Sequence, residues 1–224
     1  LPSVGAGNVL ADLIACNKVK VVTLDVVKRQ GEKSGIIRNI NKLLDGKMIE
    51  DCLDTGDAFV LKKNTVEDVQ KTIISSIRRI QKNRGLSLDE IQVLCPQKAG
   101  AVGTEYLNFL LQTAFNPLNE ENKILNKKIT LGSYGNNVKQ VDLFFKKGDK
   151  VIHTKNNYEM SWYEKGHNGD YIKCPNILGV TNGECGIIEE IRKGKNSEGE
   201  IVTQVIVKYD DYFVIYEDGV RELD

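Results

Sequence analysis

The stretch VVTLDVVKRQGEKSGIIRNINKLLDG, residues 21–46, joins a strand signal to a helix signal and decides the fold that we expect. Its first four residues are apolar or β-branched, which favours an extended strand. Ser34 then stands where a helix N-cap is expected, and Gly46 lies where the helix should end. Between them, apolar residues recur at the spacing of one helix face. The stretch therefore predicts a strand followed by a capped amphipathic helix.

The same strand and helix signals repeat further along the chain. Residues 57–61 read as a second strand, and a long helix follows, with Asn64 and Glu67 in a capping arrangement and Gly85 at its end. Residues 91–95 read as a third strand, and apolar residues at helical spacing between 107 and 115 predict a third helix. Strict alternation of this kind predicts an α/β fold with a parallel sheet and right-handed crossovers.

The amino-acid composition changes after residue 115. Residues 116–140 are polar and rich in Asn and Lys, which indicates a loop or linker. Beyond them, strand signals occur at residues 150–154, 186–191, 203–209 and 212–216, separated by Gly, Asn and Asp turns. These residues predict a small antiparallel barrel or sandwich.

Composition restricts the class of protein without identifying it. The 224 residues are 41% hydrophobic and 28% charged, as in an ordinary globular protein. Because 31 Lys and Arg balance 31 Asp and Glu, contact with a nucleic acid would depend on local clusters of charge. The five Cys include no Cys-x-x-Cys pair, and their odd number speaks against a disulfide framework. Without an apolar run long enough to span a membrane, or a signal segment at the start, we expect a cytoplasmic protein with no membrane partner.

Several motifs, in order along the chain, resemble those of the RecD-type superfamily one DNA helicases. LPSVG at residues 1–5 matches the tail of the third helicase motif, and the pair Arg29 and Gln30 matches the fourth. GDKV at residues 148–151 and NNY at residues 156–158 are similar to a strand and turn of that family. With no initiator Met, the chain reads as an internal piece of such a protein.

The resemblance implies a fold and a division into domains. Residues 1–20 would be the tail of the first motor domain and a connecting helix. Residues 21–147 would be part of a RecA-like second motor domain built on a parallel sheet. Residues 148–224 would be an SH3-like small β-barrel inserted into that motor domain.

The resemblance also implies a function, a 5′–3′ DNA helicase driven by ATP and Mg²⁺ that acts in DNA unwinding and recombinational repair. Arg29 would contact the γ-phosphate of ATP across the cleft from the missing first motor domain, and stabilise charge that develops on the phosphoryl group. Gln30 would orient Arg29 or touch the nucleotide. The plainer alternative for Arg29 is a surface residue after a strand. Because the sequence has no Gly-rich phosphate loop ending in Gly-Lys-Ser/Thr, we expect this piece alone to be inactive.

Two segments are candidates for contact with single-stranded DNA. In PQKAGAVGTEYLN, residues 96–108, small residues precede a helix, whose free amides attract phosphate. There the resemblance assigns Lys98 and Thr104 to phosphates, with Gln97 and Asn108 as helpers. The alternative is a loop with an ordinary N-cap at Thr104 and a solvated Lys98.

The second segment is KKGDKVIHTKNNY, residues 146–158, in which four lysines surround a strand and Tyr158 follows two asparagines. Lysines that neutralise phosphates and an aromatic ring that stacks on a base are typical of single-strand binding. We assign Asn157 and Tyr158 to DNA on the resemblance. The alternative is an edge strand protected by lysines, with Tyr158 in the core.

Other interpretations remain beside this one. The turn that the family places after Tyr158 aligns either with residues 182–184, which makes 159–181 an insertion, or with residues 168–170. The residues His153, His167, Cys174 and Cys185 fit no common zinc spacing. A non-enzymatic module whose barrel binds a protein partner is the main rival function, and a complete small nucleotide-binding enzyme is a second.

Overall fold

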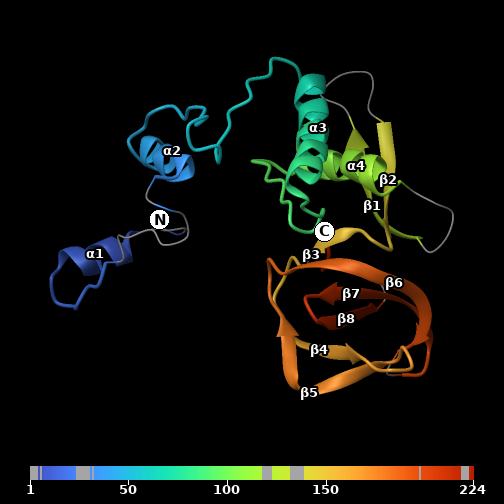
Figure 1. Ribbon diagram of the computed structural model, residues 1–224. Coiled ribbons are helices and arrows are strands. Elements are labelled where there is room, and N and C mark those ends of the chain that lie inside the picture. Colours follow the sequence, from blue (N-terminus) through green and yellow to red (C-terminus); the bar gives the residue numbers. More distant parts are fainter. Residues whose placement is uncertain are drawn as a thin grey trace. The chain divides into compact units, whose positions relative to one another are not determined.

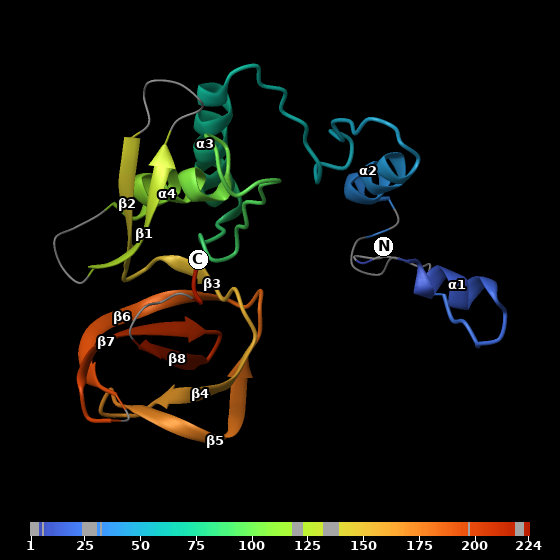
Figure 2. The same ribbon diagram turned by 180° about the vertical axis from the view of Figure 1, so that it is seen from behind.

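The computed structural model describes residue 5, residues 7–23, residue 31 and residues 33–117, 123–131, 139–196, 198–217 and 222–224. The chain divides into two compact units, an amino-terminal unit Leu1–Lys62 and a carboxy-terminal unit Lys63–Asp224. Figures 1 and 2 show the elements of each unit from two sides. Within each unit we describe only the residues given above.

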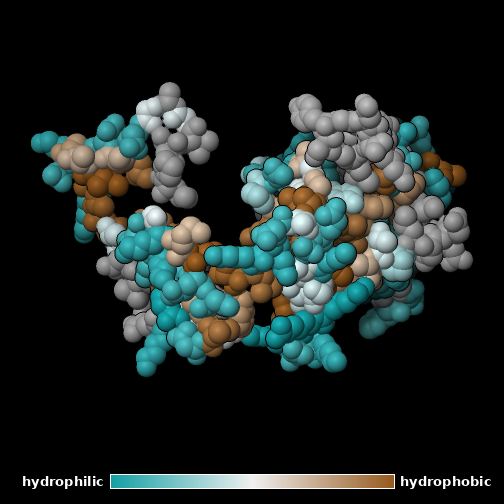
Figure 3. Space-filling view, turned by 90° about the horizontal axis from the view of Figure 1, so that it is seen from above, coloured by the Kyte–Doolittle hydropathy of each residue, from teal (hydrophilic) through white to brown (hydrophobic). Residues whose placement is uncertain are grey.

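The amino-terminal unit contains two helices, α1 (Val9–Ala15) and α2 (Gly35–Leu44). Helix α1 has no buried residue, and its apolar side chains Val9 and Leu10 are exposed. Helix α2 starts as predicted, because the Ser34 side chain accepts a hydrogen bond from the Ile36 amide. Apolar side chains are visible at the protein surface in Figure 3.

The carboxy-terminal unit begins with helices α3 (Val66–Arg84) and α4 (Thr104–Phe115). Gly85 ends α3 in the left-handed conformation, at φ +69°, as its position in the sequence predicted. The N-cap of α3 is Thr65, whose side chain accepts from the Asp68 amide, and not Asn64 as predicted. The two helices touch where the Arg78 guanidinium lies 5.6 Å from the centre of the Phe115 ring.

Two antiparallel sheets complete this unit. One is a pair of strands, β1 (Lys123–Leu131) and β2 (Lys139–Lys146). The other has six strands in the order β3-β6-β7-β8-β4-β5, and it curves strongly in Figure 1. Its strands are β3 (Lys150–Ile152), β4 (Asn157–Lys165), β5 (Tyr171–Val180), β6 (Cys185–Lys195), β7 (Ile201–Tyr209) and β8 (Tyr212–Glu217).

The main core lies against the six-stranded sheet. Val205 and Val207 of β7, Val214 of β8 and Ile188 of β6 are almost fully buried together. Met160 and Trp162 of β4 pack against this cluster. A buried polar chain crosses it, in which the Tyr209 and Tyr216 hydroxyls lie 2.7 Å apart and the Tyr216 hydroxyl lies 3.0 Å from His153 Nδ1.

The prediction of a parallel-sheet, RecA-like motor domain is wrong. All strand pairs among the described residues are antiparallel, and most of the β-structure belongs to the six-stranded sheet. Strands were expected at 21–24, 57–61 and 91–95, but the described residues of these ranges form no β-ladder. Their one β-bridge joins Ala58 to Cys52. Val22, Phe59 and Leu94 remain exposed. Short apolar runs predict a strand only if neighbouring strands pair with them, and here none does.

The linker expected from the sequence is also corrected. Strand β1 lies within the polar stretch 116–140 that was interpreted as a linker, and β2 begins in it. The stretch 159–181, an insertion in one of the two alignments, contains most of β4 and all of β5, which belong to the six-stranded sheet. The antiparallel strands expected from residue 150 onward are present as β3, β6, β7 and β8.

Candidate nucleic-acid interface

The loop before α4 is folded tightly around its own backbone. Gly103 is the N-cap, and a Cβ atom there would lie 2.4 Å from the Ala99 carbonyl oxygen, so that only glycine fits. The Thr104 amide donates to the Gln97 carbonyl at 3.2 Å, and the Glu105 amide donates to the Lys98 carbonyl at 3.2 Å. These amides at the start of the helix, expected to receive a phosphate, are therefore satisfied by the loop itself.

The four candidate residues of this segment are differently placed. The Lys98 side chain is 68% exposed, so its ammonium group is open to solvent. The Thr104 hydroxyl makes only a long contact, 3.5 Å, with the Lys98 carbonyl oxygen. Asn108 is exposed on α4, one turn after Thr104. Gln97 acts through its backbone carbonyl, as described above. Of the four, Lys98 is the only one whose side chain carries a positive charge that could contact a phosphate.

Lys98 and Asn157 are far apart in the sequence, but both contact the segment 222–224. The Lys98 ammonium lies 3.9 Å from Asp224 Oδ2. The Asn157 side-chain amide lies 3.2 Å from each carboxylate oxygen of Glu222. The folded chain thus gathers two residues of separate motifs along one three-residue segment. Sequence reasoning missed Glu222 and Asp224, because nothing in their local pattern marks them.

Tyr158 is next to Asn157 and is 69% exposed, so the core position considered as an alternative is not the one observed. Its hydroxyl accepts a hydrogen bond of 3.1 Å from the Asn156 side-chain amide. Gly179 of β5 lies close behind the tyrosine, since a Cβ atom there would be 3.2 Å from Tyr158 Cα. The ring is thereby presented to solvent, as stacking on a base requires.

Two of the four lysines around β3 serve the fold. Lys146 is buried, and its ammonium donates to the Pro117 carbonyl. Lys150 donates to the carbonyls of Asp89 and Ile91, at 2.8 and 3.0 Å. The remaining pair, Lys147 and Lys155, are exposed. Lys146 and Lys150 thus stabilise neighbouring loops through backbone carbonyls. Fewer lysines of this segment are therefore available to contact DNA phosphates than the sequence suggested.

A buried carboxylate, Asp149 of the GDKV motif, joins α4 to the segment before β3. Asp149 accepts from the Gln112 side chain at 2.6 Å, the Asn116 side chain at 2.7 Å and the Lys146 amide at 2.9 Å. Burial raises the pKa of Asp149, although these donors oppose the rise. The carboxy-terminal end of α4 is therefore tied to the start of β3, and its amino-terminal loop reaches Asp224.

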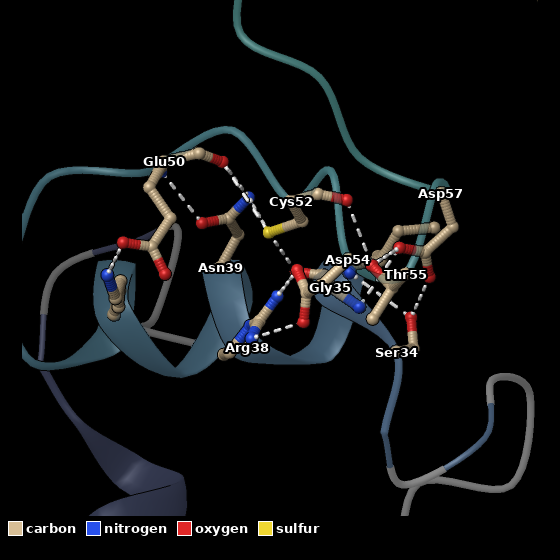
Figure 4. Close-up of polar contacts among 11 residues, drawn as sticks. Ser34, Gly35, Arg38, Asn39, Glu50, Cys52, Asp54, Thr55 and Asp57 are labelled. Atoms are coloured by element: carbon tan, nitrogen blue, oxygen red, sulfur yellow. Dashed lines mark hydrogen bonds and ion pairs between the residues drawn. The ribbon is translucent and has the colours of Figure 1, made fainter.

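Arg29 and Gln30 lie outside the described residues, but the helix that follows them is well defined (Figure 4). Asp57 caps α2 by accepting from the Gly35 amide at 3.0 Å and from the Ser34 hydroxyl at 2.6 Å. Hydrogen bonds from Ser34 and then Thr55 lower the pKa of Asp57 to about 2. Arg38 pairs with Asp54 beside this cap, at 2.7 Å. The cluster occupies the positive end of the helix with a carboxylate of the chain itself.

The described parts of the chain contain no cluster of side chains suited to a metal ion. Within them, no group of three or more His, Cys, Asp and Glu side chains is arranged to hold a metal ion. His153 is buried against Tyr216, and His167 is exposed. The sequence contains no Gly-Lys-Ser/Thr loop of the kind that holds the phosphates of ATP.

A search of protein-family models finds none that matches the chain. Among the helices that the structure describes, none has both the length and the apolar character needed to cross a membrane.

Proposed function

We propose that the carboxy-terminal unit binds single-stranded DNA through Lys98, Asn157 and Tyr158, as a segment of a RecD-type DNA helicase. The observation that carries the proposal is the meeting of Lys98 and Asn157 at residues 222–224, beside an exposed aromatic ring. An ammonium group can neutralise a phosphate, an amide can donate to one, and a tyrosine can stack on a base. The motifs at residues 1–5, 29–30 and 148–158 support the helicase assignment through resemblance.

In the intact helicase, Arg29 would contact the γ-phosphate of ATP held with Mg²⁺ by the missing first motor domain, and Gln30 would orient it. The protein would then travel 5′ to 3′ along one strand during unwinding and repair. Apolar side chains exposed on α1, such as Val9 and Leu10, support contact of the amino-terminal unit with further polypeptide.

The test of DNA binding uses a fluorescent oligo(dT) and its anisotropy over a range of salt concentrations. We expect the affinity to fall steeply between about 50 and 200 mM salt. Lys98→Ala should weaken binding several-fold and reduce the salt slope by about one unit. Lys195→Ala removes an exposed lysine at the end of β6 that lies away from β3, and should leave binding unchanged.

Tyr158 provides a second arm of the test. Tyr158→Ala should cost roughly 1–3 kcal/mol of binding free energy through lost stacking, and Tyr158→Phe should retain it. If the wild-type protein binds and Lys98→Ala and Lys195→Ala behave alike, the proposed interface is wrong.

The rival function is a protein-binding module. It is favoured by the exposed apolar side chains of the edge strand β5, where Ile172 and Leu178 are each 60% exposed. On that view, Leu178→Ser would abolish capture of a protein partner, and Lys98→Ala would have no effect on any ligand. On the DNA-binding view, Leu178→Ser leaves the affinity for oligo(dT) unchanged.

A further inference from the structure

Residues 222–224 are fixed to β3 by their backbone. The Ile152 amide donates to the Asp224 carbonyl at 2.9 Å, and the Asp224 amide donates back to the Ile152 carbonyl at 3.0 Å. The Glu222 carbonyl accepts from the Thr154 amide at 2.7 Å and from its hydroxyl at 3.0 Å. Leu223, between them, is buried in the main core. The segment is therefore held as part of the sheet, and only the outer side chains of Glu222 and Asp224 can rearrange without breaking it.

The two outer carboxylates lie where a DNA backbone would have to approach Lys98 and Asn157. The Glu222 carboxylate presents both oxygens to the Asn157 amide, and both contacts are partly buried. The Asp224 carboxylate, 24% exposed, lies opposite the 68% exposed Lys98 at the longer distance of 3.9 Å. A carboxylate and a phosphate offer the same kind of anionic oxygen to these donors. Glu222 therefore binds the Asn157 amide through two short contacts, whereas Asp224 contacts the Lys98 ammonium at a longer distance.

We propose, on the basis of the DNA-binding function above, that Glu222 and Asp224 act as an internal substitute for DNA phosphates and restrain binding until a strand displaces them. Lys98 exchanges first, because its ion pair is long and its side chain is exposed, and such exposed pairs are weak. Asn157 exchanges second, since it must leave two partly buried carboxylate contacts. The carboxylates also repel the incoming phosphates, so that weak or isolated anions do not open the interface.

The inference predicts that neutral amides in place of the carboxylates strengthen DNA binding. Glu222→Gln and Asp224→Asn keep the size of each side chain and leave the backbone bonds to β3 intact. Each should tighten binding of oligo(dT) by about threefold to tenfold at low salt, the range that removal of one nearby charge supports. The gain should shrink as added salt screens the charge.

Glu198→Gln is the matched control. Glu198 is exposed in the turn between β6 and β7, at the end of β6 away from β3, and its replacement changes the net charge equally. It should leave the affinity unchanged. In the combined variant Asn157→Ala with Glu222→Gln, the gain from Glu222→Gln should be reduced, because part of it acts by freeing Asn157.

A structural readout accompanies the affinities. In a ¹H–¹⁵N spectrum, the Asn157 side-chain amide signals should move when oligo(dT) is added to wild-type protein. In Glu222→Gln they should already be displaced from their wild-type positions before DNA is added. Circular dichroism of each variant identifies any loss of folding, and Asp224→Asn provides an independent test should Glu222→Gln fold poorly.

The outcomes separate this inference from the proposed function. If wild-type protein binds oligo(dT) and both amide variants bind with equal or lower affinity, the restraint is refuted and DNA binding stands. If wild-type protein binds too weakly to measure and the amide variants bind, both ideas are supported. If neither wild-type protein nor the variants bind at low salt, both are refuted.

Discussion

The side-chain amide of Asn157, the first residue of β4, lies 3.2 Å from both carboxylate oxygens of Glu222. A residue chosen as a DNA contact is therefore already bound to an anion of its own chain.

ATP hydrolysis should be absent from the purified chain. Its sequence contains no Gly-Lys-Ser/Thr phosphate loop, and Arg29 by itself cannot bind a nucleotide triphosphate in place of that loop. A coupled assay with and without oligo(dT) checks this, with Arg29→Ala as the control. A rate above contamination that Arg29→Ala removes would contradict the expectation.

Gly35→Ala should destabilise the amino-terminal unit by about 1–3 kcal/mol, the usual range for overpacking. An added Cβ atom would lie 2.4 Å from Cys52 Cβ and 2.6 Å from Thr55 Oγ1. Cys52 is fully buried, so faster alkylation of its thiol, followed by peptide mass spectrometry, reports opening of the unit. Gly31→Ala is the control, since no atom lies within 4 Å of the added Cβ there. Equal alkylation rates in the two variants would refute the prediction.

Asp57 should make the cap of α2 sensitive to acid. Its pKa is lowered from 3.8 to about 2, first by the Ser34 hydroxyl and then by Thr55. Because the folded pKa is the lower one, the stabilisation is complete above pH 3.8 and is lost as the pH falls toward 2. Titration of the Asp57 carboxyl carbon by NMR should give the low midpoint, and Ser34→Ala should raise it. Ser75→Ala in α3 should not change it.

Alkaline pH should destabilise the six-stranded sheet. Burial raises the pKa of Tyr209 from 10.0 to about 12, and burial likewise raises the pKa of Tyr216. The unfolded chain ionises first, so stability is constant below pH 10 and falls as the pH rises toward 12, by about 2 kcal/mol for Tyr209. Urea unfolding followed by circular dichroism measures this fall.

Two variants check the cause of the alkaline loss. Tyr209→Phe should start less stable, because the Tyr216 hydroxyl loses one of its two hydrogen-bond partners, and should lose less stability above pH 10. Val205→Ala is equally deep in the core and should lower stability by the same amount at every pH. If both variants show the same alkaline slope as the wild type, the tyrosines are not its source.

Asp149→Ala should destabilise the carboxy-terminal unit by about 2–3 kcal/mol, because the Gln112 and Asn116 amides lose a buried acceptor. Trp162, the single tryptophan, packs on Tyr209 at 5.6 Å between ring centres, so its fluorescence reports on the sheet during urea unfolding. Asp211→Ala, in the exposed turn between β7 and β8, should change little. Equal midpoints for the two variants would contradict the role of Asp149.

The helices were predictable because their signals are local. Ser34 and Gly85 act as a start and a stop through hydrogen bonds and backbone angles that involve their immediate neighbours. The strands at 57–61 and 91–95 were predicted wrongly, since an apolar run reveals nothing about whether another strand pairs with it. Strands β6, β7 and β8 were predictable because their turns contain Gly, Asn and Asp at regular intervals.

Strands β4 and β5 were missed for reasons visible in the sheet. Two register shifts in β4, between Asn157 and Tyr163, disturb the alternation that marks a strand. Strand β5 contains Pro175, which is tolerated because β5 lies at an edge of the sheet. The candidate interface was predictable only in part, because Lys98 and Asn157 belong to local motifs, whereas Glu222 and Asp224 reach them through tertiary structure.

The hydrogen bonds of Asp149 and Lys150 beside β3 decide where the protein can be truncated. Asp149 accepts hydrogen bonds from the end of α4, and Lys150 donates to the loop after α3. These two side chains, at the start of β3, therefore have their hydrogen-bond partners in the helical part of the unit. A shortened protein that began at residue 148 would leave these groups without their helical partners and expose the sheet to self-association. One that began at residue 63 keeps every one of these ties, and is the better starting point for crystallisation.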